Sequence, residues 1–258
     1  MLAISDLRYV YGRGSAAHVA VDGISLRAAA GELVTIVGTS GCGKTTLLRC
    51  IAGLQRPAHG TITVNGAVVQ GVPEGLAVVF QDYSRSLYPW LNVRDNVALP
   101  LVRTHPYQDM RWDIALRALT AVGLAHAADR YPWQLSGGMQ QRAAIARALA
   151  CDPVLLLMDE PFGSVDAQAR EDLEDLVLAL CRDRDITVLL VTHDIDESIY
   201  IGDRVIVMTG TPGHIAADLA VPLPEPRDQL ATRQLPAFVE LRAEISRLVR
   251  GRKVMAAR

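Results

Sequence analysis

One glycine-rich stretch near the N-terminus has residues suited to bind phosphate. It follows the pattern G-x-x-x-x-G-K-[ST] and reads Gly38-Thr39-Ser40-Gly41-Cys42-Gly43-Lys44-Thr45. Glycines let consecutive backbone N–H groups converge on phosphate oxygens, and the positive end of a following helix points at the same charge. Lys44 is expected to bridge the β- and γ-phosphates, and the Thr45 hydroxyl to bind Mg²⁺. The stretch lies between an apolar β-branched run and a helical run, as a phosphate-binding loop requires.

Two carboxylates follow an apolar run later in the chain. Asp159 and Glu160 come directly after Val154–Met158, which predicts a buried strand. Ligands bind at the carboxyl ends of parallel strands, so these acids are expected beside the phosphate loop. Asp159 would help hold Mg²⁺, and Glu160 would activate the attacking water as general base. Taken alone, the pattern is also typical of a strand that meets a solvated loop.

A second helix N-terminus able to bind an anion is predicted at Leu135–Arg142, which reads Leu-Ser-Gly-Gly-Met-Gln-Gln-Arg. An alanine-rich helical run continues to Ala150. The alternative is that Ser136 simply caps this helix.

At these residues the sequence resembles the ATP-binding subunit of ABC transporters, whose signature LSGGQ opens in the same way. The resemblance covers nearly all of residues 1–220. It implies that Tyr11 stacks on adenine, that Gln81 contacts Mg²⁺ and water, and that His193 senses the γ-phosphate, while Ser164-Val165-Asp166 matches the D-loop. Singly, Tyr11 could be a packed surface aromatic, Gln81 a solvated loop residue and Asp166 a helix cap. Their occurrence in the family's order favours the functional interpretation.

The site implied by the loop, the acids and the resemblance together has three parts. The nucleotide-binding residues are Tyr11, Gly38, Thr39, Ser40, Gly41, Cys42, Gly43, Lys44, Thr45, Thr46, Ser136, Gly137, Gly138 and Asp166. The Mg²⁺ ligands are Thr45, Gln81 and Asp159, and the catalytic residues are Glu160, His193 and Gln81. Met139 stands where glutamine is more usual and Val165 where many members have alanine, but neither change removes a phosphate ligand.

Composition limits the class of protein. The chain has 258 residues, a formal charge of −2 and 50% hydrophobic residues, which predicts a sizeable aliphatic core and no strong basic field for nucleic acid. Its apolar runs are far shorter than the roughly 20 residues needed to cross a bilayer, and Met1–Arg8 does not read as a signal segment. The four cysteines show no CxxC or zinc spacing, so we expect reduced thiols in a soluble intracellular protein.

Strand and helix patterns alternate along the chain and predict an α/β fold with a mainly parallel sheet. Strands are expected at 33–37, 78–80, 154–158, 187–191 and 205–208, helices at 44–54 and 140–150, and a hairpin around Asn65-Gly66. Ala115, Ala118, Leu119 and Val122 form a helical stripe that Gly123 ends. The resemblance implies a P-loop NTPase: a RecA-like core with an antiparallel β subdomain, and a helical subdomain inserted at about 82–150.

The C-terminal part is expected to be a separate segment. We assign residues 1–222 to the ATPase domain and 223–258 to a proline-rich segment with an amphipathic helix. Phe238, Leu241, Ile245 and Leu248 form a single helical stripe, so this helix should dock on its own subunit or on a dimer mate. About 35 residues are too few for an independent core, which favours a stabilising cap over a regulatory domain.

The resemblance also implies partners and a role. ATP would be bound between Lys44 of one subunit and Ser136 of another in a head-to-tail dimer, with an identical or paralogous ATPase. The chain would power import through separate permease subunits at the cytoplasmic face of the membrane, served indirectly by a solute-binding protein. Pro89-Trp90 and the proline-rich tail resemble importers of nitrate, sulfonate or taurine, although Trp90 could instead be a core aromatic of the helical subdomain.

Two other functions remain as alternatives. A non-transport ABC ATPase that acts on nucleic acid or the ribosome is disfavoured by the charge of −2 and by a single phosphate loop, and 258 residues leave no room for long coiled-coil insertions. A nucleotide-binding scaffold without hydrolysis is disfavoured because Glu160 and His193 are both present.

Overall fold

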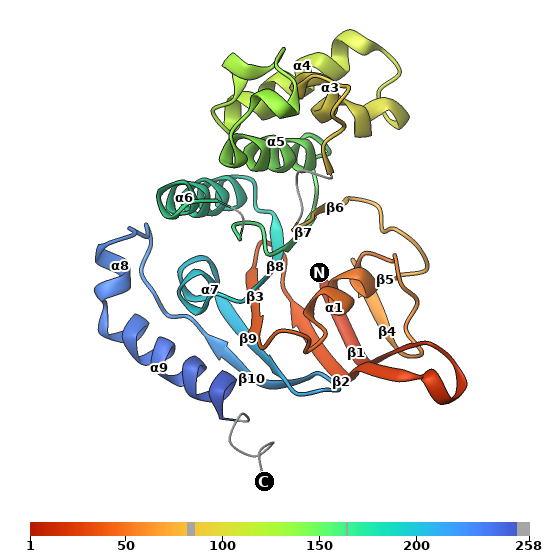
Figure 1. Ribbon diagram of the computed structural model, residues 1–258, viewed down its shortest axis with the longest axis vertical. Helices are drawn as coiled ribbons and strands as arrows, with labels where there is room; N and C mark the ends of the chain where they lie inside the picture. Colours follow the sequence, from red (N-terminus) through yellow and green to blue (C-terminus); the bar gives the residue numbers. More distant parts are fainter. Residues whose placement is uncertain (82–85, 164, 252–258) are drawn as a thin grey trace. The chain divides into compact units, whose positions relative to one another are not determined.

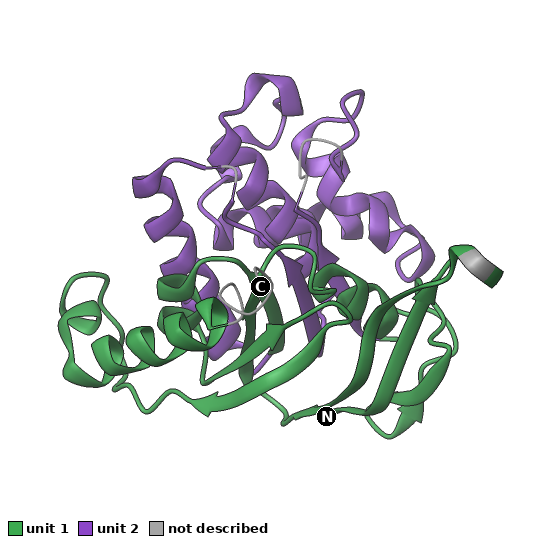
Figure 2. Cartoon of the chain, turned by 60° about the horizontal axis from the view of Figure 1, so that its bottom comes forward, with its two compact units in different colours: residues 1–74, 187–258 green, residues 75–186 purple. Residues whose placement is uncertain are grey.

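The computed structural model describes residues 1–81, 86–163 and 165–251. The chain divides into two compact units, which Figure 2 shows in different colours. Unit 1 comprises residues 1–74 and 187–258, and unit 2 comprises residues 75–186.

Unit 1 contains an antiparallel sheet with the strand order β2-β1-β4-β5. Its strands are β1 (Leu2–Tyr11), β2 (His18–Ala28), β4 (His59–Val64) and β5 (Ala67–Val68), and the short helix η1 (Gly14–Ala16) joins the first two. The predicted hairpin is confirmed: Val64 pairs with Ala67 across a turn in which Asn65 and Gly66 have φ of 51° and 79°. These are the positive angles of a two-residue hairpin turn.

Unit 1 also contains three parallel strands, with β3 (Leu33–Gly38) between β8 (Thr187–Thr192) and β9 (Arg204–Thr209) (Figure 1). Every residue of β3 and β8 is buried, which explains their continuous apolar runs. A further strand, β10 (His214–Ala220), pairs antiparallel with β9 and was not predicted from the sequence. It is partly exposed along its whole length, so it lacks the apolar run that marks the buried strands.

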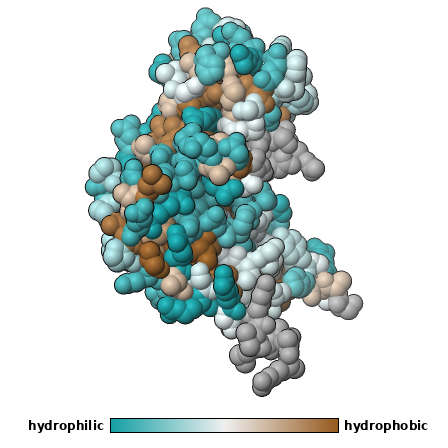
Figure 3. Space-filling view, turned by 60° about the vertical axis from the view of Figure 1, so that its left-hand side comes forward, coloured by the Kyte–Doolittle hydropathy of each residue, from teal (hydrophilic) through white to brown (hydrophobic). Residues whose placement is uncertain are grey.

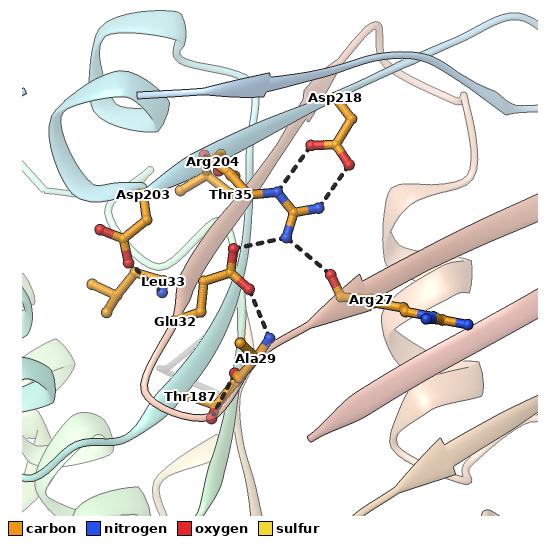
Figure 4. A network of polar contacts seen from close by, with 9 residues as sticks. All are labelled: Arg27, Ala29, Glu32, Leu33, Thr35, Thr187, Asp203, Arg204 and Asp218. Atoms are coloured by element: carbon orange, nitrogen blue, oxygen red, sulfur yellow. Dashed lines mark hydrogen bonds and ion pairs between the residues drawn. The ribbon is translucent and has the colours of Figure 1, made fainter. Parts of the chain in front are cut away.

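Arg204 connects β10 to the rest of unit 1 (Figure 4). Its guanidinium donates to both carboxylate oxygens of Asp218 on β10, at 2.6 and 3.0 Å, and to Oε1 of Glu32 at 2.7 Å. It also donates to the carbonyl of Arg27 at the end of β2. The hydrogen bonds to Asp218 and Glu32 raise the pKa of Arg204 above its already high usual value, against the opposing effect of burial.

The helices of unit 1 are α1 (Lys44–Ile51), α7 (Ile195–Ile201), α8 (Ala231–Gln234) and α9 (Pro236–Arg250). The predicted docking of the C-terminal helix is confirmed on its own chain, because α9 contacts α7, α8 and β9. Phe238 and Ile245 of the predicted stripe are buried, and Leu241 and Leu248 are half-buried.

Unit 2 contains two parallel strands, β6 (Leu76–Val79) and β7 (Leu155–Asp159), and a group of helices. Among the described residues of this unit, the helices include α3 (Val93–Ala98), η2 (Leu99–Arg103), α4 (Gln108–Ala121), η3 (Ala125–Ala127), η4 (Pro132–Gln134), α5 (Gly137–Ala150) and α6 (Ala167–Asp183). The helices α3, α4 and α5 contact one another, which agrees with the helical character predicted here. The stripe from Ala115 to Val122 is buried, and Gly123, at φ 73°, follows the end of α4.

The core is aliphatic, and the surface mixes polar and apolar residues. On the face shown in Figure 3, hydrophilic residues predominate and exposed apolar residues form separate patches. Within the described ranges, each helix is too short or too polar to span a membrane. All four cysteines are free thiols; Cys42, Cys50 and Cys181 are buried and Cys151 is exposed.

Candidate nucleotide-binding site

The predicted phosphate loop connects the end of β3 to the start of α1 within unit 1. Gly43 precedes α1 with φ of 92°, a conformation that favours glycine. It also lies tightly against β2, because a Cβ atom at Gly43 would be 2.4 Å from Cγ1 of Val21 and 2.9 Å from the carbonyl oxygen of Ala20. The loop therefore has the strand–loop–helix context that its sequence predicted.

Lys44 turns back over this loop. Its ammonium donates to the carbonyl oxygens of Gly38 at 2.9 Å and Thr39 at 3.1 Å, and the residue is only 6% exposed. Among the residues that the structure describes, Lys44 forms no ion pair with a carboxylate. A buried cation with only neutral partners is electrostatically favourable for an incoming anion, and a phosphate at the N-terminus of α1 supplies one.

Gly213 supports the loop from the segment that joins β9 to β10, and sequence reasoning missed it. Its N–H donates to the carbonyl of Ala20 at 2.9 Å, and its own carbonyl accepts from the N–H of Asp22 at 3.0 Å. A Cβ atom at Gly213 would lie 1.8 Å from the carbonyl oxygen of Cys42, so only glycine fits. The Pro212-Gly213 pair signals a turn in the sequence, but a local signal does not reveal which loop the turn meets.

Tyr11 is anchored beside the start of α1. Its hydroxyl lies 3.1 Å from Oγ1 of Thr46, and its ring meets Tyr9 edge to face at 4.8 Å. The side chain is 37% exposed, so ring surface remains for a ligand. Burial raises the pKa of Tyr11, but its hydrogen bonds to Thr46 and Gln55 outweigh this and lower the pKa overall. Tyr11 can therefore pack against Tyr9 and still present ring surface to an adenine.

The predicted catalytic acids lie in unit 2 at the end of β7. Asp159 is the last residue of this strand and is buried, and Glu160 follows it. Gln81 comes shortly after β6, the parallel neighbour of β7, and its side-chain amide donates to Oε2 of Glu160 at 2.9 Å. The two strands thus bring together residues that are far apart in sequence.

Glu160 has an unusual backbone conformation. Its φ of 45° lies in the left-handed region, where glutamate is uncommon. Such a conformation costs about 1 kcal/mol or more and is enriched at functional sites. This observation favours a catalytic role for Glu160 over the alternative that it is only an acid in a solvated loop.

Ser136 and Asp166 both cap helices in unit 2, as their alternative interpretations proposed. The Ser136 hydroxyl accepts from the N–H of Met139 at 3.4 Å at the start of α5, and the Asp166 carboxylate accepts from the N–H of Ala169 at 3.0 Å at the start of α6. Ser164 of the same predicted D-loop lies outside the described residues.

His193 lies in unit 1 between β8 and α7 and is exposed. Thr192, the last residue of β8, pairs with Val37 of the parallel strand β3. His193 and the phosphate loop therefore follow the carboxyl ends of two neighbouring strands. Asp194 caps α7 by accepting from the N–H groups of Asp196 at 2.9 Å and Glu197 at 3.2 Å.

The predicted Mg²⁺ ligands belong to both units: Thr45 to unit 1, and Gln81 and Asp159 to unit 2. A hydroxyl, an amide and a carboxylate are the oxygen donors that suit Mg²⁺ when phosphate and water complete its shell. Each of the three predicted ligands, taken singly, therefore has a chemistry that suits Mg²⁺.

Exposed aromatic side chains gather in two pairs in unit 2. Tyr88 and Trp90 lie 5.3 Å apart, and Tyr131 and Trp133 stack at 6.0 Å. Trp90 and Trp133 are each 70% exposed. The alternative that Trp90 is a core aromatic is therefore wrong, because its side chain lies mostly at the surface.

A glycine-rich loop between a buried parallel strand and a helix, with its lysine turned onto the loop, defines a P-loop NTPase fold. The pattern of the ABC transporter family matches residues 21–163, and the chain belongs to this family.

Comparisons with individual proteins agree. The nitrate import ATP-binding protein NrtD of Synechocystis sp. is 41% identical over 257 residues, which is 98% of this chain and 96% of that protein. The bicarbonate transport ATP-binding protein CmpC of Synechococcus elongatus is 43% identical over 236 residues, or 90% of this chain, but the matched part spans only 35% of CmpC. The dimeric ATP-binding cassette MJ0796, solved with ADP and phosphate in a post-hydrolysis state, superposes with a TM-score of 0.76 and 31% identity. It covers 86% of this chain and 99% of its own.

Proposed function

We propose that this chain is the ATP-hydrolysing subunit of an ABC importer, which powers uptake of a small solute through separate permease chains. The observation that carries the proposal is the buried ammonium of Lys44, held by two loop carbonyls at the N-terminus of α1 without a carboxylate ion pair among the described residues. The phosphates of ATP provide the charge that this arrangement favours.

We assign each catalytic or Mg²⁺-binding residue of the candidate site a role in hydrolysis. Glu160 accepts the proton of the attacking water, and Gln81 orients both the water and the Glu160 carboxylate through its hydrogen bond. His193 contacts the γ-phosphate. Thr45, Gln81 and Asp159 would hold Mg²⁺, which when bound neutralises charge that develops on the phosphates.

A second chain would complete the site. Gly138 lies in the first turn of α5, where an added Cβ would meet no atom of the described residues closer than 3.5 Å. Glycine in a helix costs about 0.5–1 kcal/mol relative to alanine, so packing against the described residues gives no reason for it. We infer that Gly138 and Ser136 leave space for a phosphate bound by the loop of a second subunit, identical or paralogous.

The transported solute is proposed to be a small oxyanion. NrtD and CmpC are named for nitrate and bicarbonate, and sulfonates such as taurine remain candidates of similar charge chemistry. The exposed aromatic pairs of unit 2, Tyr88 with Trp90 and Tyr131 with Trp133, are suited to contact a permease, because aromatic residues are enriched at protein interfaces. The chain would then lie at the cytoplasmic face of the membrane.

The test is reconstitution of the full chain with its permease in lipid vesicles. We expect ATP-dependent uptake of labelled nitrate or bicarbonate and its loss in Lys44→Ala. Uptake of neither anion nor of taurine, with the chain instead co-purifying with ribosomes or nucleic acid, would refute the importer assignment.

A further inference from the structure

The C-terminal segment, defined here as residues 223–250, holds α7 at both ends. Helix α7 has only seven residues, from Ile195 to Ile201. Isolated helices of this length are unstable in water, so α7 depends on its neighbours for its position. Two arginines of the C-terminal segment, Arg227 and Arg242, contact the two ends of α7.

Arg227 holds the C-terminal end of α7. Its side chain is 1% exposed, and its guanidinium donates to the carbonyl oxygens of Ile199, Tyr200 and Gly202 at 3.2, 2.5 and 2.9 Å. These carbonyls form the negative end of the helix, where a cation is favourable. Glu225 pairs with the same guanidinium at 3.0 Å. Arg227 is therefore a buried anchor.

Arg242 holds the N-terminal end. From α9 it forms a two-pronged pair with Asp196, with Nε–Oδ1 and Nη2–Oδ2 distances of 2.5 and 2.7 Å. Its guanidinium also lies over the ring of Phe238, 5.2 Å from the centroid. Because Phe238 is fully buried, the stacked arginine has a defined position on α9.

A continuous path of contacts leads from Arg242 to His193. Asp196 receives the guanidinium of Arg242 on its carboxylate and donates its N–H to the Asp194 carboxylate at 2.9 Å. Asp194 is the residue after His193, and its own N–H donates to Oγ1 of Thr192 at 3.0 Å. The two residues that flank His193 are thus fixed by β8 on one side and by the clamped first turn of α7 on the other.

We propose that the C-terminal segment is a positioning element for His193, with Arg242 acting through Asp196 and the first turn of α7. The inference goes beyond a stabilising cap, because the contact is made at the turn that presents His193. Its consequence for turnover rests on the proposed ATP hydrolysis. Its structural part, that Arg242 sets the environment of the His193 ring, does not.

The first measurement needs no activity. The imidazole NMR signals of His193 in the full chain are assigned by their loss in His193→Gln and compared in Arg242→Gln and Arg247→Gln. Arg247 is the matched control, because it is an exposed arginine on the same helix. We expect shifted and broadened His193 signals in Arg242→Gln only. Identical His193 signals in the parent chain, in Arg242→Gln and in Arg247→Gln would overturn the proposal.

The second measurement is steady-state ATP hydrolysis by the same proteins. Misplacement of a catalytic contact by about an ångström can cost on the order of 100-fold, so we expect Arg242→Gln to lower kcat by about 10-fold with unchanged KM for ATP. Arg247→Gln should match the parent in kcat and in cooperative unfolding. A parent-like kcat in Arg242→Gln despite shifted His193 signals would overturn the link to turnover.

Rescue of the ion pair separates positioning from general damage. The reversed pair, Arg242→Asp combined with Asp196→Arg, should recover part of the activity that either single change removes. If the double variant hydrolyses ATP no faster than either single variant, Arg242 does not act through this pair. If the parent chain hydrolyses no ATP, the proposed function fails, while the NMR comparison still decides the positioning role.

Discussion

The side-chain amide of Gln81 donates a hydrogen bond to Oε2 of Glu160 across 2.9 Å, and so joins the residues that follow two neighbouring parallel strands of unit 2. Glutamine at position 160 would keep an oxygen to accept this bond but would lose the base. We therefore expect Glu160→Gln to bind ATP while its turnover falls by roughly 100-fold or more. Nucleotide titration and phosphate release measure the two effects separately. Near-normal hydrolysis by the purified variant would remove Glu160 from the mechanism.

Tyr11 allows ring and hydroxyl to be tested apart. Tyr11→Ala removes the ring and should weaken ATP binding by about 1 kcal/mol, the scale of an aromatic stacking pair. Tyr11→Phe keeps the ring but loses the hydrogen bond to Thr46, which should lower folding stability by about 1 kcal/mol and leave affinity nearly unchanged. Calorimetric titration and denaturant unfolding decide this. Equal affinity in both variants would mean that the ring serves packing on Tyr9 only.

Mixed dimers test whether Lys44 and Ser136 act on one nucleotide across two chains. Lys44→Ala should abolish ATP binding at its own loop, and Ser136→Arg should block the phosphate of its partner. A mixed dimer has one intact site, so nucleotide trapped per dimer should exceed that of either variant alone. If native mass spectrometry shows mixed dimers but trapping does not rise, the two residues do not act in trans.

Arg227 should dominate the stability of the C-terminal segment. Arg227→Met leaves three backbone carbonyls without the buried guanidinium, and buried acceptors that lose their donor typically cost about 1–3 kcal/mol. The exposed Arg247→Gln should change stability by less than about 0.5 kcal/mol. Denaturant unfolding compares them. Similar midpoints for both variants would show that the segment contributes little to the fold.

The thiols of Cys42 and Cys151 should differ in labelling. Burial raises the pKa of Cys42 despite the nearby charge of Lys44, and partial desolvation raises the pKa of the Cys151 thiol, although that residue is exposed. Raised pKa values reduce the reactive thiolate at neutral pH, so labelling of both should accelerate as pH rises. Because Cys42 is 1% exposed and Cys151 is exposed, mass spectrometry should find Cys151 modified first, with ATP hydrolysis retained. Rapid loss of hydrolysis through Cys42 at pH 7 would contradict this.

Much of the candidate site could be predicted because its signals are local. The phosphate loop occupies one continuous stretch, and its conformation depends on glycines and a helix start that are adjacent in sequence. The hairpin could be predicted because Asn65-Gly66 favours a two-residue turn. The buried face of α9 could be predicted from the spacing of its apolar residues.

The tertiary structure alone decided which distant residues meet. Gly213 lies against the carbonyl of Cys42 only because the turn between β9 and β10 reaches the phosphate loop, and β10 itself has no buried face to mark it. Arg227 and Arg242 are ordinary arginines in sequence, yet one is buried at the end of α7 and the other pairs with Asp196 in its first turn. The sequence by itself determined the conformations that neighbouring residues enforce. The partners of each side chain depend on the order of the strands and the packing of the whole unit, which no local pattern encodes.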